Sequence, residues 1–226
     1  DRTNDVRRKP ELVLAFIGVR PGMTVLDVSA GGGYTTELMA RAVGPTGKVY
    51  GQSTPPDPAR AKPAAPEAGS PPPDARPRPT SAQRLAERAK NPAVSNIVPV
   101  VRRFEDPAPP ELAANAFDLV TLMFNYHDFG FMGVDRAQMN RAIFAALKPG
   151  GIYVVADHSG RPGTGISESG TLHRVEEAFV RREIEAAGFR LVGQGDFLRN
   201  PADPRDRNTP EPPMPKDEFV LKFVKP

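Results

Sequence analysis

Short apolar runs separated by turn residues recur along the chain and predict strands that alternate with helices. Five runs of strand length stand at 24–28, 48–52, 97–101, 117–124 and 152–157. Segments with helical signals stand between or beside them at 10–17, 34–43, 81–90, 135–147 and 172–187. Strands alternating with helices of this length indicate an α/β fold, with a parallel sheet covered on both faces.

The end of the chain departs from this alternation. Two further strands are expected at 189–192 and 219–224, and no helical segment lies between them. The last strand is therefore expected to run antiparallel to the rest of the sheet. Two local details are also expected: Ser81 as the N-cap of the helix over 81–90, and a solvated face for the charged residues from Arg174 to Glu185.

A proline-rich stretch at about 53–80 interrupts the pattern. It holds ten of the 27 prolines and no large apolar residue, so it cannot bury enough surface to offset the entropy of ordering. We interpret it as an extended, polyproline-like surface insertion in a single domain over 1–226, and a solvated linker is preferred to a ligand for a proline-recognising partner. A second proline-rich and charged loop, at about 193–217, is expected either to cover a pocket as a polar lid or to be a mobile surface loop.

Composition excludes several classes of function. The chain has no cysteine, which excludes disulfides and cysteine-based zinc or thiol chemistry. Its apolar runs are too short for a membrane span. The net charge is only +3, with both signs interleaved, and so there is no clustered basic face of the kind that nucleic acids bind.

The stretch from Val25 to Tyr34 carries the chemistry. A buried strand ends in Asp27, a glycine-rich turn follows, and a helix begins. This arrangement predicts a ligand site at the carboxyl end of the first strand, where glycines let the backbone approach a ligand. Nicotinamide-binding folds also have such a turn, but their spacing is G-x-G-x-x-G, and here Ser29 stands where the first glycine should be.

These residues resemble the first motif of the class I S-adenosylmethionine-dependent methyltransferases, strand-Asp/Glu-x-Gly-x-Gly-x-Gly. Shorter matches follow in the same order along most of the chain, at 20–27, 117–120, 147–151 and 187–189. The resemblance implies a Rossmann-like, doubly wound, seven-stranded sheet with an antiparallel last strand. More narrowly, the segments 125–128, 157–159 and 171–174 resemble a bacterial group of uncharacterised methyltransferases.

The resemblance also implies S-adenosylmethionine as cofactor and S-adenosylhomocysteine as product. The implied cofactor-binding residues are Asp27, Ser29, Ala30, Gly31, Gly33, Tyr34, Gln52, Phe104, Glu105 and Asn125. Two departures stand out. Ser29 replaces a glycine, and Gln52 stands where the family has an acid that binds the ribose, so a ribose contact would lack charge assistance.

Three histidines provide candidate catalytic groups. His127 follows the fourth strand, His158 follows the fifth, and His173 lies shortly after, so the first two are expected at the ligand-binding rim of the sheet. We expect His127 or His158 to act as general base, oriented by Asp128 or Asp157, with His173 within reach. Three further expectations concern this region. The backbone carbonyls of Phe124 and Asn125 are expected to face the cofactor amine, Tyr126 is expected to stack on a ligand, and no metal site is expected.

The preferred hypothesis is direct, in-line methyl transfer to a small-molecule acceptor. The alternatives are a non-catalytic binding or interaction protein on the same fold and, less favoured, a nicotinamide oxidoreductase. No nucleic-acid partner is expected, and monomer and dimer are left open. Cofactor supply favours the cytoplasm. The chain starts at Asp1, so a periplasmic protein after removal of a leader is a second possibility.

Overall fold

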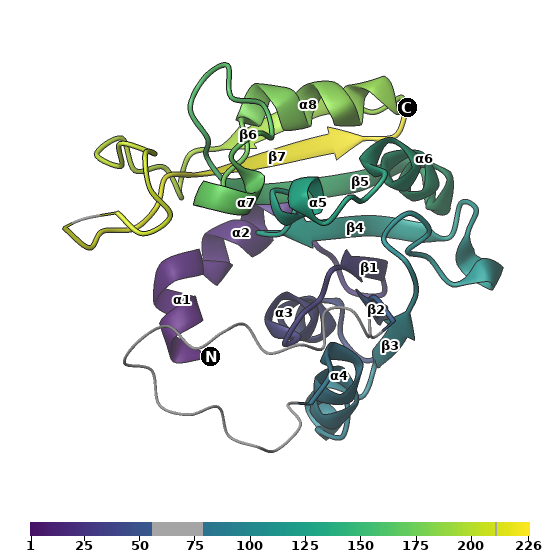
Figure 1. Ribbon diagram of the computed structural model, residues 1–226. Helices are drawn as coiled ribbons and strands as arrows, with labels where there is room; N and C mark the ends of the chain where they lie inside the picture. The colour runs from purple at the N-terminus through teal and green to yellow at the C-terminus, as the bar shows by residue number, and fades with distance from the viewer. Residues whose placement is uncertain (56–78, 211) are drawn as a thin grey trace.

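The structure, a computed structural model, describes residues 1–55, 79–210 and 212–226, which build a seven-stranded sheet covered by helices on both faces (Figure 1). The strand order is β3-β2-β1-β4-β5-β7-β6. Pairing is parallel from β3 through β5, and β7 runs antiparallel to both β5 and β6. The strands are β1 Thr24–Val28, β2 Lys48–Ser53, β3 Ile97–Val101, β4 Phe117–Met123, β5 Leu147–His158, β6 Arg190–Gly195 and β7 Glu218–Val224. The expected doubly wound sheet with an antiparallel last strand is confirmed.

Helices cover the two faces of this sheet. The α-helices are α1 Arg2–Arg8, α2 Pro10–Ile17, α3 Tyr34–Val43, α4 Ser81–Arg88, α5 Asp128–Phe131, α6 Arg136–Ala146, α7 Ser169–Leu172 and α8 Glu177–Ala186. Two short 3₁₀ turns are η2 Pro92–Val94 and η3 Pro110–Leu112. Buried residues of α6 and α8 pack on one face of the sheet, and those of α2, α3 and α4 pack on the other.

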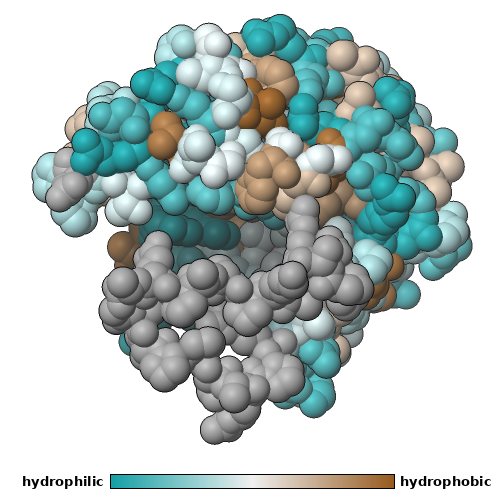
Figure 2. All heavy atoms as spheres, viewed as in Figure 1, coloured by the Kyte–Doolittle hydropathy of each residue, from teal (hydrophilic) through white to brown (hydrophobic). Residues whose placement is uncertain are grey.

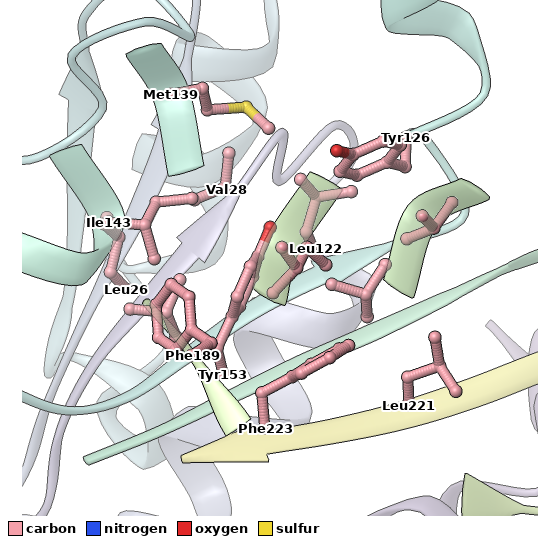
Figure 3. Close-up of a cluster of buried hydrophobic side chains, with 14 of the residues drawn as sticks. Leu26, Val28, Leu122, Tyr126, Met139, Ile143, Tyr153, Phe189, Leu221 and Phe223 are labelled. Atoms are coloured by element: carbon pink, nitrogen blue, oxygen red, sulfur yellow. The ribbon is translucent and has the colours of Figure 1, made fainter. Parts of the chain in front are cut away.

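Alternation along the strands divides the core in two. In β1, Val25 belongs to the cluster under α2 and α3, whereas Leu26 and Val28 belong to the cluster under α6 and α8. Successive side chains of a strand point to opposite faces, so a strand buried on both sides is apolar throughout. Figure 3 shows Met139 and Ile143 of α6 facing Leu26, Val28 and the aromatic residues of the sheet. Because β1 pairs in parallel with both β2 and β4, the carboxyl ends of these three strands lie at the same edge of the sheet.

Side-chain caps set two helix starts. Asp135 caps α6 by accepting from the Gln138 backbone at 2.8 Å. Thr80 caps α4 in a reciprocal pair with Gln83, whose side chain accepts from the Thr80 backbone at 2.7 Å. The expectation that Ser81 is the cap is therefore wrong by one residue: Ser81 is the first residue inside the helix.

The expected helix over 172–187 is broken, which corrects two predictions. The chain leaves α7 at Leu172, takes a left-handed conformation at His173 (φ 51°), and starts α8 only at Glu177. The intervening Arg174 is fully buried and forms an ion pair with Asp203 at 2.9 Å. Arg174 is thus not part of a solvated helical face, because the turn at His173 directs it into the protein.

Other boundaries shift by a few residues. The strand expected from residue 152 begins at Leu147, and α1 and α5 have no counterpart among the expected helices. Residues 56–78 of the proline-rich insertion lie outside the described residues, and so its expected conformation stays a prediction. Among the helices of the described segments, none combines the length and apolar character needed to cross a bilayer. On the face seen in Figure 2, hydrophobic residues of the described part form small, separate areas.

Candidate functional site

The glycine-rich turn after β1 has two different functions in the structure. Gly33 is left-handed (φ 84°), and a Cβ there would lie 2.8 Å from Leu85 Cδ2 of α4, so this glycine permits the packing of a helix. A Cβ on Gly31 would have its nearest neighbour at 3.9 Å, and one on Gly32 would meet nothing within 4 Å. The backbone of Gly31 and Gly32 is therefore the part of the turn that is open to a ligand.

Two cavities flank this turn at the carboxyl edge of the sheet. The first, which we call the Asp27 cavity, has a volume of about 340 Å³ and is lined by Arg8, Asp27, Gly32, Tyr34, Phe124 and Asp128, among others. The second, the Phe104 cavity, has a volume of about 880 Å³ and is lined by Ser53, Thr80, Arg103, Phe104, Glu105 and Val134, among others. Ser29, Gly31 and Asn125 line both. Together they form an elongated site that crosses the ends of β1, β2 and β4, where ligands of open α/β sheets bind.

Asp27 lies at the floor of its cavity and is almost completely buried. It accepts hydrogen bonds from the hydroxyl groups of Thr36 of α3 at 2.6 Å and Thr121 of β4 at 2.8 Å. Burial outweighs these bonds and raises the pKa of Asp27 to about 6. A carboxylate held in this way is a strong acceptor for a cationic or hydroxyl group placed in the cavity.

Arg8 of α1 lies on the other side of the same cavity. Its guanidinium lies 4.5 Å from the centre of the Phe124 ring and 5.5 Å from that of Tyr34. Its Nε atom is buried without a hydrogen-bond partner, and burial lowers the pKa of Arg8. A buried donor without a partner is costly, and Arg8 lines the Asp27 cavity, so its guanidinium is a candidate partner for an anionic group bound there.

A chain of hydrogen bonds, here called the Ser29 chain, links the glycine turn to the histidines. The Ser29 backbone, left-handed at φ 57°, donates to Gln52 Oε1 at 2.8 Å, and the Ser29 hydroxyl donates to Asn125. Asn125 in turn donates to Asp128 Oδ2 at 3.0 Å. Gln52 is fully buried and also donates to the Arg102 carbonyl at 2.7 Å. The amide of Gln52 thus joins the loops after β1 and β3, and the expected ribose contact stays a prediction.

His127 follows β4 and is held between two carboxylates. Its Nδ1 lies 2.6 Å from Asp157 Oδ1, its Nε2 lies 3.1 Å from Asp128 Oδ1, and its backbone N–H donates to Asp157 Oδ2 at 2.7 Å. Burial alone would lower the pKa of His127, but Asp157 and Asp128 raise it to about 9. Both ring nitrogens are therefore engaged, and the side chain is only 5% exposed.

His173 and Asp128 form the accessible part of the cluster. His173 Nδ1 lies 2.8 Å from Asp128 Oδ1, and the His173 side chain is 38% exposed. Burial acts to raise the pKa of Asp128, but hydrogen bonds from His127 and His173 lower it overall. The structure thus brings His127, Asp128 and His173 together, and Asp128 connects this cluster to the Asp27 cavity, which it lines.

His158 has different surroundings. Its ring lies between Phe124 and His127, with centroid distances of 5.7 and 5.3 Å. Its Nδ1 is 2.9 Å from Glu218 Oε1 but does not have the geometry of a hydrogen bond. Burial lowers the pKa of His158 to about 3 and raises the pKa of Glu218 to about 7. His158 is thus a neutral ring packed behind the cluster, and the expected partner Asp157 contacts His127 through its side chain instead.

The other expected residues are placed as follows. Tyr34 lines the Asp27 cavity and donates to Asp5 Oδ1 of α1 at 2.7 Å, and burial together with Asp5 raises the pKa of Tyr34 to about 12. Phe104 and Glu105 line the Phe104 cavity, and Ala30 lines the Asp27 cavity.

Tyr126 does not face a ligand: it is fully buried, and its hydroxyl donates a hydrogen bond to Glu183 at 2.7 Å. The expectation of a stacking role for Tyr126 is therefore wrong.

The charged loop before β7 is anchored by ion pairs. Arg199 pairs with Glu177 of α8 at 2.5 Å, and Arg205 pairs with the buried Asp217 at 2.8 Å. Together with the Arg174–Asp203 pair, these contacts hold the described part of the loop against α8 and the end of β5. Its role as a lid stays a prediction.

Sequence reasoning missed Arg8, Thr36 and Thr121. A threonine on a strand or helix gives no sign that its hydroxyl will meet a particular carboxylate. No pattern in the sequence points to Arg8, which ends α1 just before a left-handed turn at Lys9 that joins α1 to α2.

The chain is similar to known proteins at two levels, in a segment of its sequence and in its fold. A model of the protein-L-isoaspartate(D-aspartate) O-methyltransferase family matches residues 10–56, which include β1, the glycine turn and β2. A SAM-dependent methyltransferase from Aquifex aeolicus is similar over 100% of this chain and 94% of its own, with 19% identity and a TM-score of 0.68.

Other solved structures have the same architecture. A TehB-like SAM-dependent methyltransferase from Corynebacterium glutamicum is similar over 96% of this chain and 88% of its own, with 15% identity and a TM-score of 0.56. The [4+2]-cyclase SpnF is similar over 97% of this chain and 81% of its own, with 17% identity and a TM-score of 0.66. At these identities the likeness establishes the fold. Because a cyclase shares it, the reaction has to be argued from the site.

Proposed function

We propose that this chain is an S-adenosylmethionine-dependent methyltransferase that acts on a small molecule. The observation that carries the proposal is the elongated site beside the open backbone of Gly31 and Gly32, in a fold shared along its whole length with a SAM-dependent methyltransferase. The family model adds support because its match covers the turn itself. When bound, this cofactor would supply an electrophilic methyl group on a sulfonium.

The two cavities fit the two halves of such a cofactor. The Phe104 cavity, with an aromatic wall and the carboxylate of Glu105, suits an adenosine group. The Asp27 cavity, with a carboxylate on one side and the half-buried Arg8 on the other, suits an amino-acid group. Asp27 would face the ammonium and Arg8 the carboxylate, since each charge then meets its opposite in a site of low dielectric.

The acceptor is proposed to meet the histidine cluster at the end of the Asp27 cavity. Both ring nitrogens of His127 face carboxylates and its side chain is only 5% exposed, so an acceptor does not reach this ring directly. His158 is packed between two rings. His173 and Asp128 are therefore the groups that an acceptor reaches, and we propose that they position it and that its proton is lost there.

Two other functions have less support. A nicotinamide cofactor would need the G-x-G-x-x-G turn, and the backbone of Ser29 is instead tied to Gln52. A non-catalytic binding protein would explain the Ser29 and Gln52 departures. It leaves the carboxylate-bound histidine cluster without a use.

Calorimetric titration with S-adenosylhomocysteine tests the proposal. We expect binding by the wild-type chain and a loss of about 10- to 100-fold in Arg8→Ala, the range of a charge-assisted bond to a carboxylate. Arg7→Ala is the matched control, because Arg7 lies on the same helix and is exposed. Adenosine, which lacks the carboxylate, should bind both variants equally. If a folded wild-type chain binds neither S-adenosylmethionine nor S-adenosylhomocysteine, the proposal is refuted.

A further inference from the structure

Contrary to the expectation from the sequence, we infer that His127, Asp128 and His173 form a binding site for a divalent first-row transition-metal ion. One donor atom from each of the three lies within 4.8 Å of the others. Asp128 Oδ1 is 3.1 Å from His127 Nε2 and 2.8 Å from His173 Nδ1. Ligands in neighbouring positions around a metal at roughly 2.1 Å are themselves about 3 Å apart, so little movement is needed to place an ion among them.

A second carboxylate fixes the orientation of the first histidine. Asp157 is fully buried and holds His127 twice, through the ring Nδ1 at 2.6 Å and through the backbone N–H at 2.7 Å. The opposite ring nitrogen, Nε2, is thereby directed at Asp128. Metal-binding histidines usually donate their other ring nitrogen to a carboxylate, which fixes the tautomer and strengthens the ligand. A histidine that only packed against its neighbours would not need both the ring contact and the backbone contact with Asp157.

The backbone at His173 brings the third ligand into place. This residue is not a glycine and yet has a left-handed φ of 51°, a conformation that ends α7 and turns the ring toward Asp128. Its ring meets those of Phe131 and His127 edge-on, at 5.8 and 5.6 Å. Unfavourable backbone conformations persist where the surroundings impose them, and they are concentrated at functional sites.

The ligand set defines the class of ion and leaves room for a substrate. Two imidazoles and one carboxylate favour zinc, iron, cobalt or nickel over magnesium and calcium, which prefer oxygen ligands. Three protein ligands leave coordination positions open, and Asp128 lines the Asp27 cavity, from which an acceptor would reach them. The ion's role in catalysis, unlike its binding, rests on the proposed function. An acceptor hydroxyl bound to the ion would lose its proton to solvent more readily and present its oxygen to the methyl group.

Cobalt(II) titration of the tag-free chain after dialysis against a chelator tests the site. We expect one equivalent of Co²⁺ to bind and to give the visible absorption of a coordinated ion. His173→Ala should weaken binding at least 100-fold, and Asp157→Asn, which touches no metal, should weaken it about 10- to 100-fold. His158→Gln is the matched control, because it removes the third of the chain's three histidines and keeps the full ligand set. Its Co²⁺ affinity should equal that of the wild type.

Either of two outcomes would overturn the inference. One is the absence of stoichiometric Co²⁺ binding by the wild type, and the other is equal Co²⁺ affinity in the wild type and His173→Ala. Melting curves in the presence of chelator establish that each variant is folded, and His173→Gln replaces the alanine variant if that one melts early. Binding of S-adenosylhomocysteine is measured separately on the metal-free chain. Cobalt binding without S-adenosylhomocysteine binding would reject the proposed function and keep the metal site, and the reverse result would reject only the metal site.

Discussion

Replacing Asp27 by asparagine should change the pH dependence of stability in a defined direction. In the folded protein the pKa of Asp27 is about 6, against an ordinary value of 3.8, because the carboxyl group is buried. A raised pKa means that the folded state keeps its proton more strongly than the unfolded state. The resulting stability is fully present below pH 3.8 and is lost as the pH rises through 6.

The size of the effect follows from the shift. A difference of about 2 pKa units corresponds to about 3 kcal/mol over the whole pH range, and about 1.4 kcal/mol of it falls between pH 5 and pH 8. The asparagine side chain does not titrate, so the stability of Asp27→Asn relative to the wild type should increase by that amount between these pH values. Any constant cost of the changed hydrogen bonds cancels in this comparison.

Urea denaturation of both proteins at intervals from pH 5 to pH 8 measures the difference directly, and the corresponding relative shift in melting temperature is about 3–6 °C. Asp118→Asn is the control. Burial acts to raise the pKa of Asp118, but hydrogen bonds from Lys148 and from the Thr24 backbone lower it overall. Asp118 is therefore fully ionised from pH 5 to pH 8. The difference in stability between Asp118→Asn and the wild type should not change over these pH values. A flat difference for Asp27→Asn as well would refute the reasoning.

Three further changes test the packing around the site, each by urea denaturation. Gly33→Ala should destabilise the chain by at least about 2 kcal/mol, because a left-handed alanine would also collide with α4, whereas Gly32→Ala should cost less than about 1 kcal/mol. Arg174→Met should cost about 3–5 kcal/mol, because it leaves the buried carboxylate of Asp203 without its only cationic partner among the described residues; a cost below about 1 kcal/mol would contradict this reasoning. Thr80→Ala should cost about 1 kcal/mol and Ser81→Ala much less, which separates the observed cap from the one expected from the sequence.

The sequence predicted the elements whose boundaries are encoded locally. Pro10 starts α2 and Gly44 ends α3, and both act through backbone geometry that needs no tertiary contact. It failed where tertiary contacts decide. The 172–187 segment has a continuous helical signal, yet a buried ion pair and a parallel bridge from Val175 to Ser159 break it.

The sequence predicted which edge of the sheet carries the candidate site, but not which side chains contact one another there. Residues that follow parallel strands share one edge, which placed His127 and His158 near the glycine turn in advance. Which carboxylate meets which ring depends on side-chain direction across β4 and β5. Adjacent residues of a strand point to opposite faces, so the sequence neighbours Asp157 and His158 were not expected to be a necessary side-chain pair. That rule does not select a partner, and the structure shows that Asp157 contacts the ring of His127 and only the backbone of His158.

The Ser29 chain has a consequence for how the two ends of the site communicate. It runs without interruption from the glycine turn, through Asn125, to the carboxylate that both histidines share. A ligand that shifts Asn125 on one side would change the hydrogen bonding of Asp128 on the other. Binding at the turn and binding at the histidine cluster are then thermodynamically linked, and each ligand must alter the affinity of the other by the same factor. The coupling would pass through a single amide side chain, that of Asn125.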